Sequence, residues 1–222
     1  MPARVSVIIP VLNEAARIAA ALAALAPLRA QGAELIVVDG GSRDGTPALC
    51  AGLVDAVLAS PPGRATQMNA GARAASGSIL LFLHADTTLP AGALALITQA
   101  GAPWGRFDVT IAGRSVLLPL VAALMNLRSR LTGIATGDQA LFVRRDVFDA
   151  VGGFPEQPLM EDIELCKRLR RRGRPACLRA RVTTSGRRWD SRGAWRTIVL
   201  MWRLRLLYWL GVPAERLAAA YR

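Results

Sequence analysis

Three apolar segments in the first 90 residues each end in polar side chains, and this pattern strongly limits the folds open to the chain. The segments and their polar followers are Val5–Ile9 with Asn13 and Glu14, Glu34–Val38 with Asp39, and Ile79–Leu83 with His84 and Asp86. Short, continuous apolar runs of this kind are typical of parallel strands buried on both faces. Ligand sites in open α/β sheets lie outside the carboxyl ends of such strands. We therefore expect the three strands to deliver polar groups to one edge.

Helical patterns separate these strands. Ala15–Arg29 is rich in Ala and Leu, with apolar residues at helical spacing, and Pro47–Leu53 and Ala65–Ala75 are further candidate helices. Val54–Leu58 is a short candidate strand. Alternation of strand and helix over roughly 85 residues predicts an α/β fold with a doubly wound, mostly parallel sheet flanked by helices.

The second half of the chain is less regular. We expect strands at Phe107–Ala112, Ala140–Val143 and Arg179–Thr184, and helices at Leu117–Leu131, Glu161–Arg172 and Trp195–Leu210. The length favours one domain over residues 1–222.

The formal net charge of +12 is carried almost entirely by arginine, because Lys167 is the only lysine. High Ala and Arg content partly reflects genomic composition, so the charge alone identifies no partner. It is compatible with nucleoside diphosphates, with anionic lipid and, less specifically, with nucleic acid. Cys50, Cys166 and Cys177 are widely spaced, which favours reduced thiols over disulfides or zinc. With no secretion signal visible, we expect a cytoplasmic protein.

Each polar residue at the predicted edge has a structural and a functional interpretation. Asp39 is either a turn or capping residue or a fixed carboxylate that accepts the imide N–H of a uracil ring. Asp86 is either a turn aspartate or a ligand of a divalent cation that bridges a diphosphate. His84 fits a core position or a ligand equally well.

A second group of carboxylates opens the predicted helix that begins at Glu161. The helix dipole favours acidic residues there and keeps Asp162 ionised, as a general base requires. Glu164 has a partner in Arg168 one turn on, whereas Glu161 and Asp162 have no basic residue at that spacing. Glu161 and Asp162 are therefore the better site candidates, with a charged first turn as the alternative.

Taken together, the motifs closely resemble the inverting family 2 glycosyltransferases of the GT-A fold. The matching segments are residues 7–14, 37–46, 70–71 with Gly77, 82–86 and 160–162. Residues 63–71, 84–87, 137–145 and 187–189 resemble a compact bacterial subfamily described as associated with radical-SAM proteins or arsenosugar biosynthesis.

The resemblance implies a nucleotide-binding half to about residue 86, an acceptor half to about residue 190 and a helical tail from about residue 191. It also implies a role for each matching residue. Those expected to bind the donor nucleotide are Pro10, Asn13, Glu14, Asp39, Arg64, His84 and Asp86. Asp86 would also hold Mn²⁺ or Mg²⁺ in a D-x-D-like motif, in which His84 replaces the usual first Asp. Asp162, with Glu161 beside it, would be the catalytic base of a single inverting displacement. Residues expected on the acceptor side are Asp138, Gln139, Arg187, Arg188 and Trp189.

The expected partners are a nucleotide-sugar donor, most simply a UDP sugar, and a hydroxyl acceptor, with no nucleic acid. Trp195–Leu210 is interrupted by arginines, which argues against a membrane span. Packing on protein and interfacial binding to an anionic membrane, at its inner face, remain alternatives for this helix. Two other functions compete: a sugar-phosphate nucleotidyltransferase, which would consume a nucleoside triphosphate, and a basic membrane or nucleic-acid adaptor, which would bind no nucleotide sugar.

Overall fold

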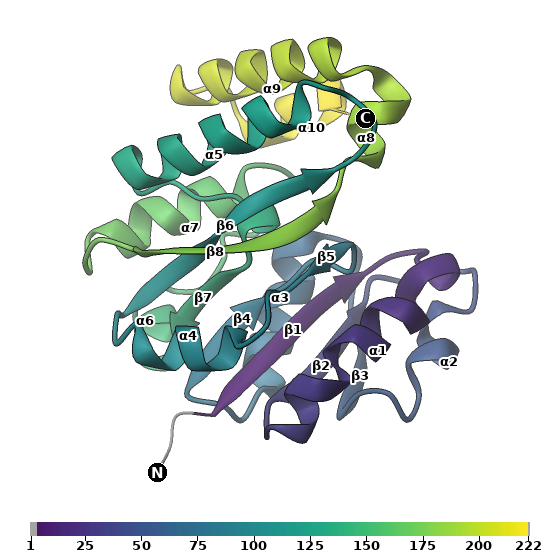
Figure 1. Ribbon diagram of the computed structural model, residues 1–222. Helices are drawn as coiled ribbons and strands as arrows, with labels where there is room; N and C mark the ends of the chain where they lie inside the picture. Colours follow the sequence, from purple (N-terminus) through teal and green to yellow (C-terminus); the bar gives the residue numbers. More distant parts are fainter. Residues whose placement is uncertain (1–3, 222) are drawn as a thin grey trace.

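The computed structural model describes residues 4–221 and contains one eight-stranded sheet (Figure 1). The strand order is β3-β2-β1-β4-β7-β6-β8-β5. The strands are β1 (Val5–Val11), β2 (Glu34–Asp39), β3 (Ala56–Ala59), β4 (Ile79–Phe82), β5 (Thr87–Thr88), β6 (Trp104–Ala112), β7 (Leu141–Arg144) and β8 (Ala176–Ser185). β1 pairs in parallel with β2 and β4, and β2 with β3, so the predicted parallel half is confirmed.

Beyond β4 the strand directions change. β7 runs antiparallel to β4 and to β6, while β8 pairs in parallel with β6 and antiparallel to the two-residue β5. A register shift between Phe107 and Asp108 interrupts the β6–β8 pairing. This mixed half follows β4 in the strand order, at the opposite end of the sheet from β3.

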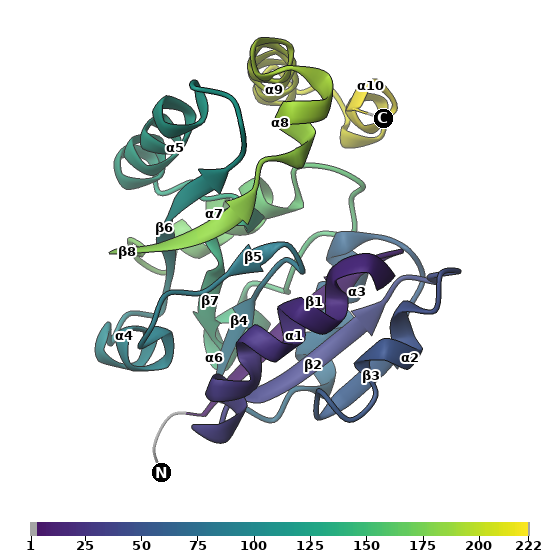
Figure 2. The ribbon, with the colours of Figure 1, turned by 45° about the vertical axis from the view of Figure 1, so that its right-hand side comes forward.

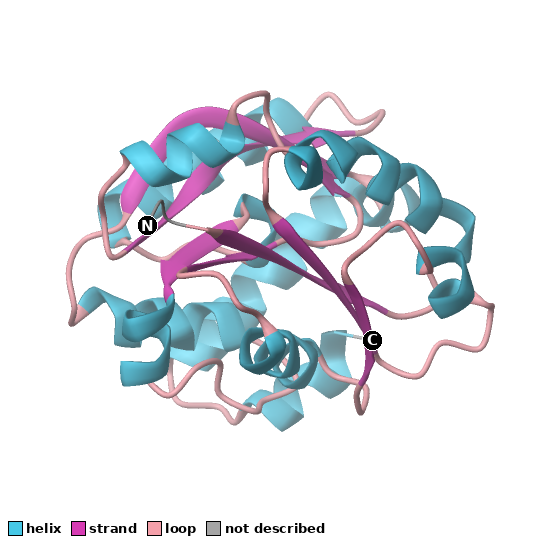
Figure 3. Ribbon diagram, turned by 90° about the horizontal axis from the view of Figure 1, so that it is seen from below, coloured by secondary structure: helices cyan, strands magenta, loops and turns pink. Residues whose placement is uncertain are grey.

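Helices cover both faces of the sheet (Figure 3). They are α1 (Ala15–Ala30), α2 (Thr46–Cys50), α3 (Arg64–Ala74), α4 (Ala93–Gln99), α5 (Leu118–Thr132), α6 (Arg145–Ala150), α7 (Glu161–Arg170), α8 (Arg187–Arg192), α9 (Ala194–Trp209) and α10 (Ala214–Tyr221). Buried side chains of α1, α2, α4 and α5 form one apolar core, and those of α3, α6 and α7 form a second on the opposite face.

The C-terminal helices gather at the end of the molecule remote from the N-terminus (Figure 2). Leu204 of α9 and Leu217 of α10 pack with Leu159 and Met160, the two residues that precede α7. Within residues 4–221, the chain has no helix with both the length and the apolar content that crossing a bilayer requires. Packing on protein thus accounts for one face of α9, and its other face remains exposed.

The expected elements all form, with ends shifted by a few residues. The sequence analysis missed β5, α4, α6, α8 and α10. These are short: β5 has two residues and α6 and α8 have six each, too few for a periodic apolar pattern to be recognised.

A buried polar network fastens α5 to β6. Asn126 accepts a hydrogen bond from the N–H of Val109 (2.8 Å) and donates one to its carbonyl (3.0 Å), as a neighbouring strand would. Asp108 accepts hydrogen bonds from the fully buried Arg106 and from Arg130 of α5. Asn126 therefore provides hydrogen-bond partners for backbone groups of β6 beyond the residues that pair with β7. The network also fixes the position of α5.

We expect Asn126→Ala to lower the free energy of unfolding by at least about 2 kcal/mol, because it leaves buried backbone groups of Val109 without partners. Urea unfolding followed by circular dichroism measures the change. Ala123→Ser, at an exposed position on the same helix, should stay within about 0.5 kcal/mol of the parent. Equal stability of the two variants would contradict the role assigned to the network.

Candidate active site

Asp39, the last residue of β2, is held by the turn that follows it. Its Oδ2 accepts hydrogen bonds from the N–H groups of Gly41 (3.0 Å) and Ser42 (2.9 Å), and Gly41 takes a positive φ of 91° to allow this. Its Oδ1 is buried and has no hydrogen-bond partner among the described residues. An unpaired buried carboxylate oxygen is costly, which marks this atom as a place where a ligand donor fits.

The loops after β1 and β2 hold each other through backbone groups. Asn13, at a positive φ of 55°, accepts a hydrogen bond from the N–H of Arg43 and donates its own N–H to Ser42. At the start of α1, which has no side-chain cap of its own, Asp44 accepts a hydrogen bond from the N–H of Ala15, and Thr46 accepts one from the N–H of Glu14. The hydrogen-bonded loops after β1 and β2 therefore form a fixed surface beside Asp39 and the half-buried Pro10.

Gln67 lies beneath these two loops, and the sequence analysis missed it. Its buried amide donates to the carbonyls of Val11 (2.9 Å) and Val38 (2.8 Å), which joins the ends of β1 and β2. A Cβ on Gly40 would meet this amide at 3.0 Å. The signal that could have found Gln67 is its place within the residue 63–71 motif.

Arg187 brings the end of β1 and the loop after β4 together. Its guanidinium lies 3.6 Å from Asp86 Oδ2 and 4.0 Å from Glu14 Oε1. Asp86 lines an open hollow of about 720 Å³ with Arg114, Ser185, Arg187, Arg188, Asp190 and Ser191. The predicted donor-side residues Glu14 and Asp86 thus lie around a residue that we had expected on the acceptor side.

Asp86 is the residue of this hollow best suited to a divalent cation. Its side chain is 30% exposed, and the ion pair with the half-exposed Arg187 is loose. Asp190 is engaged instead, since both its carboxylate oxygens accept the N–H of Arg114. Residues 4–221 contain no cluster of three or more His, Cys, Asp or Glu side chains arranged around a common point. A single carboxylate that acts with substrate phosphates and water nevertheless suits Mg²⁺.

His84 and Asp138 meet across the sheet edge. His84 Nδ1 lies 3.3 Å from Asp138 Oδ1, and this hydrogen bond lowers the pKa of Asp138 against the opposing effect of burial. Gly137 packs so closely on the imidazole that a Cβ would come within 2.5 Å of it. His84, which we had expected on the donor side, therefore contacts the turn that carries Asp138, which we had expected on the acceptor side.

Asp162 lies at the start of α7, opposite the same turn. Its Oδ2 accepts the N–H of Gly137 (3.1 Å) and its Oδ1 that of Ile163 (2.7 Å). Burial, reinforced by the neighbouring charge of Glu161, raises the pKa of Asp162 to about 6. Glu161 is itself buried and lies 3.8 Å from Arg64. Asp162 therefore becomes a stronger base while it remains ionised at neutral pH.

The structure corrects one expected contact. Gln139 is fully buried and donates to Asn126 Oδ1 and Ser129 Oγ, so its amide supports the turn and does not face a substrate. Asp138 remains 45% exposed, and Arg188 stacks on the ring of Tyr221 at 3.6 Å. Trp189 packs on the core that includes α5.

The raised pKa of Asp162 predicts a pH-dependent stability. The folded protein holds this proton over a range where the unfolded chain, with a pKa near 3.8, has lost it, so stability falls as pH rises from about 4 to about 6. We expect this decrease in the parent and its loss in Asp162→Asn, measured by urea unfolding at half-unit pH intervals. Parallel pH profiles for the two proteins would contradict the assignment.

Comparisons with known proteins bear on this arrangement. Residues 6–101 match the family model described as Glycosyl transferase family 2. No curated protein sequence gives a significant match. Among solved structures, a mannosyltransferase from Pyrobaculum calidifontis in complex with GDP-Man and Mn²⁺ is similar, with 24% identity and a TM-score of 0.67 over 92% of this chain and 61% of the other.

Two further structures give similar results. Residues 1–349 of TarS from S. aureus match with 21% identity and a TM-score of 0.67, over 82% of this chain and 60% of the other. Glucosyl-3-phosphoglycerate synthase from Mycobacterium tuberculosis, in complex with Mn²⁺, UDP and glucosyl-3-phosphoglycerate, matches with 24% identity and a TM-score of 0.59, over 82% of this chain and 71% of the other. The chain spans about three fifths of the length of the first two structures.

At these identities the structural matches show the fold, and the family model matches the segment that carries β1 to β4 and the loops around Asp39 and Asp86. The chain therefore has the GT-A fold, and its residues 6–101 match the model of glycosyl transferase family 2.

Proposed function

We propose that this protein transfers a sugar from a nucleotide sugar to an acceptor hydroxyl and inverts the configuration of the anomeric carbon. The observation that carries the proposal is the unpaired, buried Oδ1 of Asp39 at the carboxyl end of β2. A nucleobase that donates an N–H to this oxygen would remove the cost of leaving it unpaired. Uracil has such an imide N–H, which favours a UDP sugar as donor.

The diphosphate would lie beyond the base, along the line from Asn13 to Asp86. Arg187 borders this path between Glu14 and Asp86, and Arg64 borders it beside Glu161. Asp86 would hold a divalent cation, whose positive charge would stabilise the negative charge of the departing diphosphate. The similar structures from Pyrobaculum calidifontis and Mycobacterium tuberculosis contain Mn²⁺ or Mg²⁺ with a nucleotide or nucleotide sugar, which supports this role.

Asp162 would act on the acceptor. The acceptor oxygen attacks the anomeric carbon, its proton passes to Asp162, and the bond from that carbon to the diphosphate oxygen breaks. Glu161 helps to set the basicity of Asp162 and also neutralises Arg64, while the Gly137 N–H fixes the carboxylate. His84, bonded to Asp138, lies between the metal-binding and acceptor sides.

Binding experiments test the donor side. Asp39→Ala should weaken UDP binding and narrow its preference over other nucleoside diphosphates, because the imide N–H loses its acceptor. Asp86→Ala should keep the fold but lose the increase in UDP affinity that Mn²⁺ gives. Calorimetry with and without Mn²⁺ measures both effects, and Asp149→Ala, at an exposed position on α6, is the control. Unchanged discrimination in the Asp39 variant would place base recognition elsewhere.

Transfer kinetics test Asp162. Asp162→Asn should reduce single-turnover transfer by roughly 10²-fold or more while donor affinity changes little, because the carboxylate acts as the new bond forms. In the parent, the transfer rate should increase with pH up to about 6 and then level off. Loss of donor binding with normal transfer per bound donor would contradict the assignment.

A further inference from the structure

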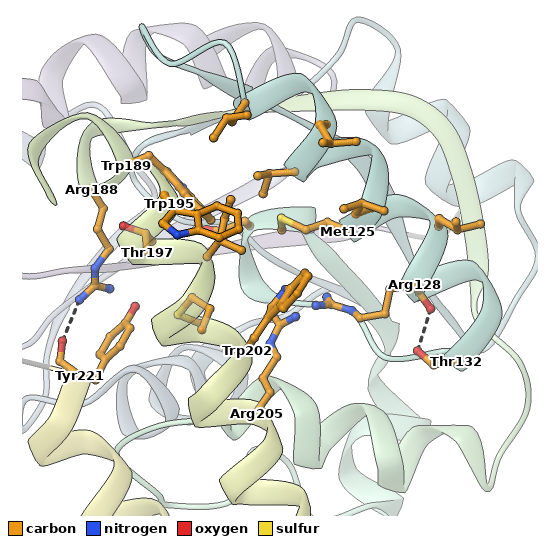
Figure 4. A pocket seen from close by; sticks show the side chains of 18 of the residues that line it. Met125, Arg128, Thr132, Arg188, Trp189, Trp195, Thr197, Trp202, Arg205 and Tyr221 are labelled. Carbon is orange, nitrogen blue, oxygen red and sulfur yellow. Dashed lines mark hydrogen bonds between the residues drawn. The ribbon is translucent and has the colours of Figure 1, made fainter. Parts of the chain in front are cut away.

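An apolar groove of about 600 Å³ lies between α5 and α9, next to the candidate active site (Figure 4). Leu120 (58% exposed), Leu124 and Leu131 line it from α5, and Trp195 (68% exposed) and Trp202 line it from α9. A volume of this size is typical of small-molecule sites. The donor side described above does not use this groove.

Two arginines in the groove have buried nitrogen atoms without partners. Nε and Nη2 of Arg128, from α5, and Nε of Arg205, from α9, form no hydrogen bond with the described residues. Figure 4 shows their guanidinium groups turned toward one another beside Trp202. Burial lowers the pKa of Arg128, with Arg106 adding repulsion. An anion between the two guanidinium groups would offset their repulsion and accept hydrogen bonds from their unpaired nitrogen atoms. Guanidinium binds phosphate and carboxylate through paired hydrogen bonds.

The groove leads to the residues proposed for catalysis. Asp138 lines it at one end and bonds to His84, which faces the donor edge. The charge of Asp162 acts on Arg128, which places that guanidinium within electrostatic reach of the proposed base. An anion held by Arg128 and Arg205 would thus lie on the acceptor side.

We propose that the groove binds the acceptor, and that the acceptor is an amphiphile with one hydrocarbon chain, a phosphate group and the hydroxyl that receives the sugar. This inference rests on the proposed function. The chain would lie along the leucines of α5 and the tryptophans of α9, and the phosphate would bridge Arg128 and Arg205. The oxygen that receives the sugar would lie toward Asp138 and Asp162. A purely apolar occupant, such as the same face of a second copy, would leave the buried arginine donors unpaired.

Decyl phosphate, used below its micelle concentration, is the probe for this site. Titration followed by tryptophan fluorescence and calorimetry should show saturable binding at one site. Decyltrimethylammonium tests the need for the anion, and inorganic phosphate tests the need for the chain. Both should bind at least about tenfold more weakly, because charged hydrogen bonds and chain burial each contribute at least that factor.

Matched variants on α9 separate the groove from general surface binding. Arg205→Gln and Trp202→Ala should each weaken decyl phosphate binding by about tenfold, whereas Arg203→Gln and Trp209→Ala, at exposed positions on the same helix, should leave it unchanged. Trp202→Phe serves as a second variant if Trp202→Ala unfolds. UDP binding should be normal in all of them.

Equal binding of the cationic and anionic probes, or equal effects of Arg203→Gln and Arg205→Gln, would overturn the proposal. The proposal would also be overturned if the parent is a dimer that binds no decyl phosphate and if Trp202→Ala converts that dimer to a monomer in sedimentation. If the parent binds UDP with Mn²⁺ but no decyl phosphate, the acceptor inference fails and the proposed function stands. If it binds decyl phosphate but no nucleotide, the proposed function fails.

Discussion

The short turn Gly137–Gln139 connects the parts of this molecule that chemistry would have to bring together. The Gly137 N–H fixes Asp162 of α7, Asp138 bonds to His84 after β4, and Gln139 reaches into the core to Asn126 and Ser129 of α5. Gly137 also approaches the His84 imidazole so closely that this position has no room for a side chain. Loss of this turn would remove the contacts that join Asp162, His84 and α5.

The candidate site keeps several polar groups in costly states while the surrounding backbone is well satisfied. Asp39 has one oxygen fully bonded and one unpaired, and Asp162 is buried beside the buried Glu161. Such arrangements reduce stability, and they are typical of sites where a ligand or a reacting group completes the interactions. The paired loops around Asn13 and Thr46, and the amide of Gln67, supply the rigidity that holds these groups in place.

The C-terminal helices add a second layer to the GT-A sheet. α9 packs through Leu204 on α10 and on the residues before α7, so one face of the helix is used for folding. Its other face, with Trp195 and Trp202, borders the groove opposite α5. The buried network of Asn126 and Asp108 fixes α5 on β6, which keeps the two walls of the groove apart. The buried, unpaired nitrogen atoms of Arg128 and Arg205 between the walls favour an anionic ligand over a neutral one.

The amino-acid sequence determined the parallel half of the sheet, because Val5–Ile9, Glu34–Val38 and Ile79–Leu83 are continuous apolar runs with helical patterns between them. It also indicated that Asn13, Asp39 and Asp86 share one edge, since parallel strands carry their carboxyl ends to the same side. The sequence also predicted the strand that forms β7, but not its antiparallel direction. That direction and the short elements β5, α6 and α8 depend on contacts between segments distant in sequence, which local patterns do not encode.

Only the tertiary structure decided which polar groups meet. Arg187 comes from α8 to lie between Glu14 and Asp86, and Gln139, which the sequence placed at the acceptor, is buried against α5. The same holds for Arg128 and Arg205, which lie 77 positions apart in the chain and face each other across the groove. Burial and pairing are properties of surfaces formed on folding, so a residue's type and spacing do not reveal them.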